Sequence, residues 1–92
     1  MINVAAGKKL DFTQEQVSTP KGWAIESRVY AEDPTKYLPS IGRLSRYIEP
    51  TGPSVRCDSG IVEGSEISVY YDPMICKLVT GGHDREEALA RM

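Results

Sequence analysis

The sequence contains few of the residues on which metal and disulfide sites depend. Its 92 residues include only two cysteines, Cys57 and Cys76, and a single histidine, His83. The cysteines stand alone and lack the CxxC spacing of a zinc site, so no bound metal is expected. One disulfide bridge is possible, but two free thiols in a reducing compartment are the expected state.

The sequence also has no excess of positive charge and no long apolar segment. Lysine and arginine number 11 against 13 aspartate and glutamate residues, which gives a formal net charge of −2. Without a basic stripe, neither nucleic acid nor an anionic membrane is expected as a partner. The apolar runs are only a few residues long and too short to span a bilayer. No glycine-rich loop leads into a helix, so no unaided cradle for the phosphates of ATP is predicted.

What is present is the composition of a globular domain. Hydrophobic residues make up 40% of the chain and charged residues 26%, which argues against intrinsic disorder. We expect residues 1–92 to belong to a single domain. By area scaling, a chain of this size buries roughly 60–65% of the surface that its unfolded form exposes.

Both ends of the sequence carry the signature of a helix terminus. Gly7 is followed by two lysines, and glycine in a left-handed cap with basic residues nearby is typical of a helix C-terminus. Residues 1–7 are therefore predicted to be the end of a helix that begins upstream. Asp84 is a candidate N-cap with Glu87 three residues later, as in a capping box, so residues 84–92 are predicted to start another helix. Truncated helices are thus expected at both ends of a domain fragment.

The body of the chain, residues 22–81, alternates between strand and turn patterns. Apolar and polar residues alternate most regularly over residues 22–30, as in a half-buried strand. Further short strands are expected where strand-like segments return, at residues 43–50, 54–59, 67–73 and 74–82. Two prolines and a glycine break the first strand from the next with a long loop. These features predict a β-rich α+β fold built on an antiparallel sheet of about five short strands.

Taken one by one, the polar residues offer only weak candidate sites. A thiol dyad of Cys57 with His83 would make a hydrolase, but no nucleophile signature surrounds either cysteine. Cys76 alternates with apolar residues, so we expect it to pack in the core. The adjacent carboxylates Glu32 and Asp33 are expected to cap a turn rather than to share a proton.

Several blocks of the sequence, considered together, resemble the C-terminal part of biotin carboxylases. They include RVYAEDP at residues 28–34, PSIGRLSRY at 39–47 and YYDPMICKL at 70–78. The similarity runs over essentially the whole chain. Agreement of several blocks in order and spacing is more specific than any single motif. PSIGRLSRY and GSEISVYYDPMI are most similar to the propionyl-CoA branch of the acyl-CoA carboxylases.

The resemblance implies an ATP-dependent ligase. Biotin carboxylases use ATP, bicarbonate and magnesium to carboxylate a ureido nitrogen of biotin held on a carrier domain. The implied partners are this carrier domain, bicarbonate and the carboxyltransferase beta subunit. The implied location is the mitochondrial matrix in a eukaryote or the cytoplasm in a bacterium. The family's ATP and magnesium ligands lie in segments that this sequence does not match, so the isolated chain is expected to be inactive.

Arg56 is the one residue to which the resemblance assigns a catalytic role. In the family, an arginine on the strand equivalent to SVRCDS meets negative charge on bicarbonate or on the ureido oxygen of biotin. Arginine has donors but no acceptor and stays charged, so it can stabilise an oxyanion but cannot act as the base. Only Asp58 nearby can pair with it, and a solvated strand arginine is the alternative. The same cation is expected to favour the thiolate of Cys57.

Two further expectations concern Arg28 and an alternative function of the whole chain. Arg28 is assigned a structural role, paired with Glu26 across a neighbouring strand or with Glu32. An alternative function for the whole chain is a non-catalytic β-rich module that assembles carboxylase subunits. Such a module would present a face of exposed apolar residues to its partner.

Overall fold

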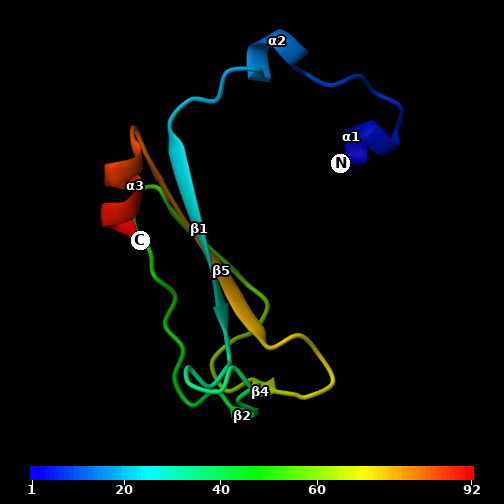
Figure 1. The fold of residues 1–92 in the computed structure, drawn as a ribbon. Helices are drawn as coiled ribbons and strands as arrows, with labels where there is room; N and C mark the ends of the chain where they lie inside the picture. The colour runs from blue at the N-terminus through cyan, green and yellow to red at the C-terminus, as the bar shows by residue number, and fades with distance from the viewer.

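A computed structural model describes residues 1–92 as short elements arranged around one central strand (Figure 1). The elements, in chain order, are α1 (Ile2–Ala5), α2 (Gln14–Val17), β1 (Trp23–Tyr30), β2 (Gly42–Arg43), β3 (Val55–Ser59), β4 (Glu66–Ile67), β5 (Met74–Gly82) and α3 (Arg85–Arg91). Five antiparallel strands with short helices at either end confirm the expected β-rich α+β class.

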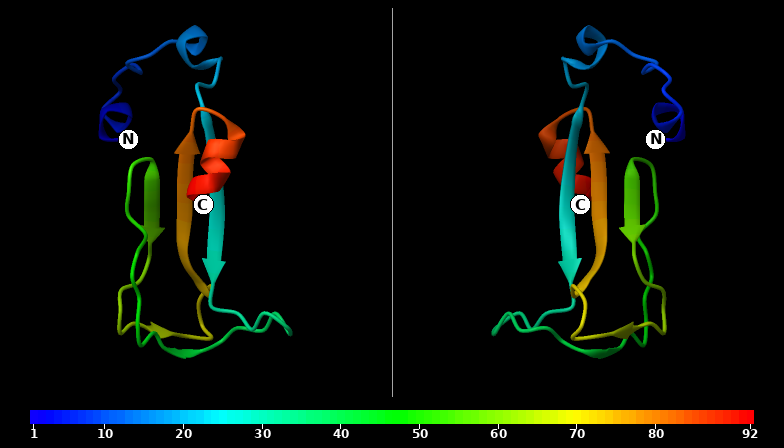
Figure 2. Two further views of the ribbon diagram at one scale, coloured as in Figure 1. Left: turned by 90° about the vertical axis from the view of Figure 1, so that its left-hand side faces the viewer. Right: turned by 90° about the vertical axis from the view of Figure 1, so that its right-hand side faces the viewer.

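The main sheet has three strands in the order β1–β5–β3, with β5 antiparallel to both neighbours (Figure 2). Its register pairs Thr80 of β5 with Ile25 on one side and with Val55 on the other. Since paired residues share a face and successive residues alternate, this register sorts the side chains into two layers. One face carries these largely apolar residues, and the opposite face carries charged ones.

The prediction of one sheet was wrong, because β2 and β4 form a separate two-stranded sheet. The strands predicted at 43–50 and 67–73 shrink to two residues each. In these segments, side chains accept hydrogen bonds from backbone amides that would otherwise donate to a neighbouring strand. The amide of Tyr47 donates to the Glu63 carboxylate, and the amide of Tyr70 donates to Ser68 Oγ. Such local side-chain bonds compete with sheet formation.

The predicted helix ends are confirmed by their hydrogen bonds. Gly7 has φ of 77° and its amide donates to the Val4 carbonyl, while the next amide donates to Asn3, as in a Schellman motif. Asp84 caps α3 by accepting from the Glu87 amide at 2.8 Å. The Glu87 carboxylate accepts from His83, one residue before the N-cap, so the return bond of the expected capping box is shifted.

Helix α2 was not predicted, although its sequence carried a signal. Thr13 and Gln16 form a complete capping box, with the Thr13 amide donating to the Gln16 side chain at 2.8 Å. This threonine-x-x-glutamine spacing is a helix-start pattern. Both α1 and α2 lie beyond one end of the main sheet (Figure 2). No helix in the structure has both the length and the apolar character needed to cross a membrane.

Helix α3 packs on the apolar face of the main sheet, over β5 and β1. The fully buried Thr80 donates its hydroxyl to the Ala88 carbonyl at 2.7 Å, and Ala88 is itself fully buried. Gly82 allows this close approach, because a Cβ at that position would lie 2.6 Å from the Ala88 nitrogen. The far face of the sheet is covered by no helix or strand (Figure 2).

The core is small, and the expected degree of burial was too high. Only Ile67, Cys76, Thr80 and Ala88 are buried, which confirms the core position of Cys76. The accessible surface is 7792 Å², whereas a compact protein of this mass exposes about 5,300 Å². The chain buries about half of its unfolded surface, rather than the expected 60–65%. Its radius of gyration is 17.6 Å, against about 12 Å for a compact domain of this length. A single layer with open faces explains both differences.

Candidate functional site

Arg56 lies on β3 with its side chain on the uncovered face of the main sheet. Its register partner is Val79, which in turn pairs with Glu26 of β1. The side chain is 71% exposed, and its Nη2 lies 3.2 Å from Oδ2 of Asp58. The Arg56 side chain is therefore open to solvent on this face.

Arg56 is part of a larger set of ionic residues that we call the charged face. Two cross-strand rows build it, one through Val79 and the other through Lys77, which pairs with both Arg28 and Asp58. The ionic members of the charged face are Glu26, Arg28, Arg56, Asp58 and Lys77. Three cations and two carboxylates leave a net positive charge, which favours an anion or a developing oxyanion.

The reverse side of β3 is anchored by a hydrogen-bonded cluster. Ser59 donates its hydroxyl to the Ile61 carbonyl at 2.9 Å, and its Oγ lies 2.9 Å from the Tyr47 hydroxyl. The Tyr47 oxygen also lies 3.8 Å from the Cys57 sulfur. Burial raises the pKa of the Tyr47 hydroxyl, so it stays protonated at neutral pH. These contacts hold the strand that carries Arg56 from behind.

The expectation of a reactive Cys57 was wrong. Burial raises the pKa of its thiol instead of lowering it. The side chains of Arg56 and Cys57 follow each other on a strand and so point to opposite faces, which keeps the cation away from the sulfur. His83 lies five residues beyond Leu78, the register partner of Cys57, which is on the order of 16 Å along the strand. The thiol dyad is therefore not formed. Both cysteines are free thiols.

Arg28 forms neither of the two expected ion pairs. Its Nη2 contacts the Met74 sulfur at 3.5 Å, and its guanidinium lies 5.3 Å from the centre of the Tyr30 ring. A cation over an aromatic face is a favourable packing arrangement. The structure thus keeps Arg28 in a structural role but corrects its expected partners, Glu26 and Glu32.

Of the adjacent carboxylates in the AEDP block, Asp33 caps a turn, as expected. Asp33 Oδ1 accepts hydrogen bonds from the Thr35 and Lys36 amides, both at 2.8 Å. The bonds from the Lys36 and Thr35 amides lower the pKa of the Asp33 carboxyl, because they stabilise its charged form. This motif therefore shapes the loop after β1.

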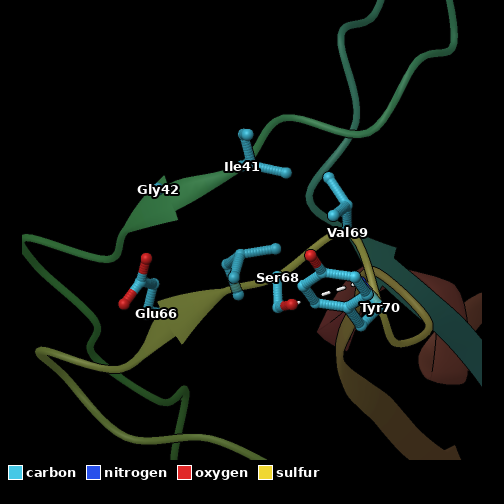
Figure 3. Close-up of a pocket in the computed structure, with 7 residues that line it drawn as sticks. Ile41, Gly42, Glu66, Ser68, Val69 and Tyr70 are labelled. Carbon is cyan, nitrogen blue, oxygen red and sulfur yellow. Dashed lines mark hydrogen bonds between the residues drawn. The ribbon is translucent and has the colours of Figure 1, made fainter.

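The largest surface hollow, of about 550 Å³, lies beside the β2–β4 pair (Figure 3). Its walls include Ile41, Glu66, Val69 and Tyr70, with the Tyr70 amide bonded to Ser68 Oγ at 3.1 Å. Glu66 is its only titratable acid, which offers little chemistry. Arg56 lines none of the hollows in the structure. No group of three or more His, Cys, Asp or Glu residues is placed to hold a metal ion.

The fold and the charged face together define the class of this protein. It has two small antiparallel sheets, and the larger one carries helix α3 on one face and exposes an arginine on the other. Residues 26–92 match the family described as the biotin carboxylase C-terminal domain. The chain belongs to this family, which confirms the resemblance found in the sequence.

Individual relatives agree with this assignment. The chain is 66% identical over 95 residues to the mitochondrial propionyl-CoA carboxylase alpha chain of Caenorhabditis elegans, covering 100% of this chain and 13% of the relative. It is 48% identical to biotin carboxylase 1 of Bacillus subtilis, covering 99% of this chain and 20% of the relative. The chain therefore spans about one eighth to one fifth of the length of these relatives.

A solved structure shares the fold. It is the biotin carboxylase domain dimer of Hydrogenobacter thermophilus 2-oxoglutarate carboxylase, in complex with MgADP, ADP and bicarbonate. The TM-score is 0.92 at 41% identity, and the match covers 99% of this chain and 20% of that chain. The observed arrangement of two small sheets and short helices is therefore one that occurs inside a much larger biotin carboxylase domain.

The raised thiol pKa predicts slow modification of Cys57 in the folded protein. A suitable host is a chimeric alpha chain, in which this chain replaces the matching segment of the C. elegans relative. Near neutral pH, iodoacetamide is expected to alkylate Cys57 several-fold more slowly than it alkylates the thiol of free glutathione. The reason is that little of Cys57 is present as the thiolate. Peptide mapping by mass spectrometry measures the rate, with the urea-denatured chimera as control. Alkylation as fast as that of glutathione would contradict the burial argument.

Proposed function

We propose that this chain is part of the biotin carboxylase component of an acyl-CoA carboxylase, with propionyl-CoA as the acyl substrate of the whole enzyme. The whole enzyme would carboxylate carrier-bound biotin with ATP and bicarbonate. The observation that carries the proposal is the exposed Arg56 on the charged face of a chain of this family. The names of the C. elegans and B. subtilis relatives support the reaction and the acyl-CoA branch.

The chemistry proposed for Arg56 follows from its donors. A guanidinium carries five N–H groups and stays protonated at any working pH. Only Nη2 is engaged, by Asp58, so Nε and Nη1 can donate to an oxygen of bicarbonate or to the ureido oxygen of biotin. Negative charge grows on the ureido oxygen as its neighbouring nitrogen loses a proton. A preorganised donor stabilises that charge in the transition state more than in the ground state.

The residues of this chain fit biotin and bicarbonate better than ATP and magnesium. The positive charged face suits an anion or an oxyanion, whereas no group of carboxylates is placed to hold magnesium. No glycine-rich loop precedes a helix in a way that would cradle phosphates. We therefore assign the binding of ATP and magnesium to other parts of the enzyme. This division predicts that the isolated chain is inactive.

The expected partners and location belong to the same proposal. Arg56 is open to solvent and lines no hollow. Other parts of the enzyme therefore have to supply the remaining contacts to its ligand. The biotin carrier domain would bring biotin to the charged face, and the carboxyltransferase beta subunit would use the carboxylated biotin. The name of the C. elegans relative supports a mitochondrial location in a eukaryote, and we propose the matrix there and the cytoplasm in a bacterium.

An assembly module remains the second candidate function, favoured by the exposed apolar side chains. They gather in the loops around β2 and β4 and include Ile41, Ile48, Val62, Val69, Tyr70 and Tyr71. Exposed apolar residues of this kind mark surfaces that contact another part of a protein or another chain. The two candidate functions predict different effects of losing Arg56. Carboxylation of biotin requires Arg56, whereas assembly of subunits does not.

The chimeric alpha chain tests the proposed function. We expect it to carboxylate biotin in the presence of ATP and bicarbonate at a rate of the same order as the C. elegans host. The control is the host with the matching segment deleted, which should be inactive because Arg56 and its sheet are then missing. Circular dichroism and size-exclusion chromatography establish that the chimera is folded. A folded, correctly assembled chimera that does not carboxylate biotin would contradict the catalytic proposal and favour the assembly module.

A further inference from the structure

Asp58 lies between two cations of the charged face. Its Oδ2 is 3.2 Å from Nη2 of Arg56 and 4.0 Å from Nζ of Lys77. Arg56 and Asp58 are two residues apart on β3, so their side chains emerge on the same face. Lys77 comes from β5 and is the direct register partner of Asp58. The same Asp58 oxygen thus contacts Arg56 on its own strand and Lys77 on the neighbouring strand.

Arg56 has no other polar contact to hold its side chain. Its guanidinium is 71% exposed and makes no hydrogen bond to the backbone or to another side chain. An arginine side chain has many rotamers, and restricting them has an entropic cost when a ligand binds. A donor contributes fully to catalysis only when its position is set before the reaction. Asp58 is the one side chain in contact with the Arg56 guanidinium and so the one that can fix its position.

We propose that Asp58 is a positioning residue for Arg56. It holds Nη2 so that Nε and Nη1 face the ligand, and Lys77 keeps the carboxylate from rotating away. The proposal rests on the proposed role of Arg56 in biotin carboxylation. The Asp58 side chain is 39% exposed, and its Oδ2 is engaged by both cations. It acts through the orientation of the guanidinium.

An ordinary surface ion pair is the competing explanation, and it has different consequences. Exposed pairs contribute little to stability, because solvent screens them and two side chains have to be ordered. Loss of such a pair would leave turnover unchanged. Loss of a positioning residue lowers kcat for biotin carboxylation while the KM for ATP stays the same, since the ATP site lies outside this chain. It also has no effect once Arg56 is gone.

The experiment is a double-mutant cycle in the chimeric alpha chain. Asp58→Asn keeps the shape of the side chain and removes its charge, and Arg56→Met removes the guanidinium. Glu86→Gln is the matched control, because Glu86 is an exposed acid on α3, away from the charged face, and forms no ion pair. Free biotin serves as acceptor, and kcat, the KM for ATP and the melting temperature are measured for each variant.

We expect Asp58→Asn to lower kcat by about fivefold, the upper end of what an exposed ion pair supplies. Glu86→Gln should have no effect, Asp58→Glu should restore part of the activity, and Asp58→Asn should add no loss to Arg56→Met. Unchanged kcat in Asp58→Asn, with activity lost in Arg56→Met, overturns this inference alone. An equal further loss in the Arg56→Met background also overturns it. Full activity of Arg56→Met overturns both this inference and the proposed role of Arg56.

Discussion

Replacing Arg56 with methionine is expected to lower kcat for biotin carboxylation in the chimeric alpha chain by about 10²- to 10³-fold. Methionine keeps much of the side chain's length and removes every donor, so the growing negative charge loses its stabilising group. The KM for ATP should stay the same, because the proposal assigns ATP binding to other parts of the enzyme. Steady-state kinetics with free biotin as acceptor measure both quantities.

Two control variants separate the guanidinium of Arg56 from charge in general. Arg56→Lys keeps the positive charge and loses the planar fork of donors, so a partial loss of kcat is expected. Arg28→Met removes a cation from the same charged face, where Arg28 contacts Met74 and Tyr30, and should leave kcat close to that of the parent. Full activity of Arg56→Met would show that Arg56 is only a solvated strand residue. An equal loss in Arg28→Met would assign the effect to the overall charge of the face.

The isolated 92-residue chain is expected not to unfold cooperatively. Only four of its residues are buried, and ordering each residue costs about 1–2 kcal/mol of backbone entropy. Large side chains that would form a core are exposed instead, including Phe12, Trp23, Ile48 and Tyr70. A radius of gyration of 17.6 Å describes a layer that needs another surface against it. Poorly dispersed ¹H–¹⁵N correlation spectra and a melting curve without a sharp transition are the expected results.

The same preparation provides the control for this prediction. Excess biotin with bicarbonate should not shift the amide signals around Arg56, because an unfolded chain has no charged face. The chimeric alpha chain should melt cooperatively, since its host supplies the missing surfaces. Well-dispersed signals from the isolated chain, together with a sharp melting transition, would contradict the argument from burial. Shifts confined to Val55–Ser59 would further show that the chain binds ligand by itself.

The sequence alone determined the features that depend on neighbouring residues. Alternation located β1, short strand-like segments bounded by turns located β3 and β5, and Gly7 and Asp84 marked the helix ends that the structure shows. These features follow from local backbone preferences and hydrogen bonds over a few residues. The combined blocks also identified the family, and with it Arg56 as the candidate site residue. Its partner Asp58 was visible because the two are close on one strand.

Only the tertiary structure decided how distant segments pair. The register of β3 on β5 places Lys77 opposite Asp58 and leaves His83 beyond the end of the sheet. It also separated β2 and β4 into a second sheet and left one face of the main sheet open. Register between strands is set by packing and turn geometry across the whole fold, and a shift of one residue would move every side chain to the opposite face. For that reason the sequence, through its resemblance to the family, identified Arg56 and its neighbour Asp58, while the partners of Arg56 from β1 and β5 became known only from the folded sheet.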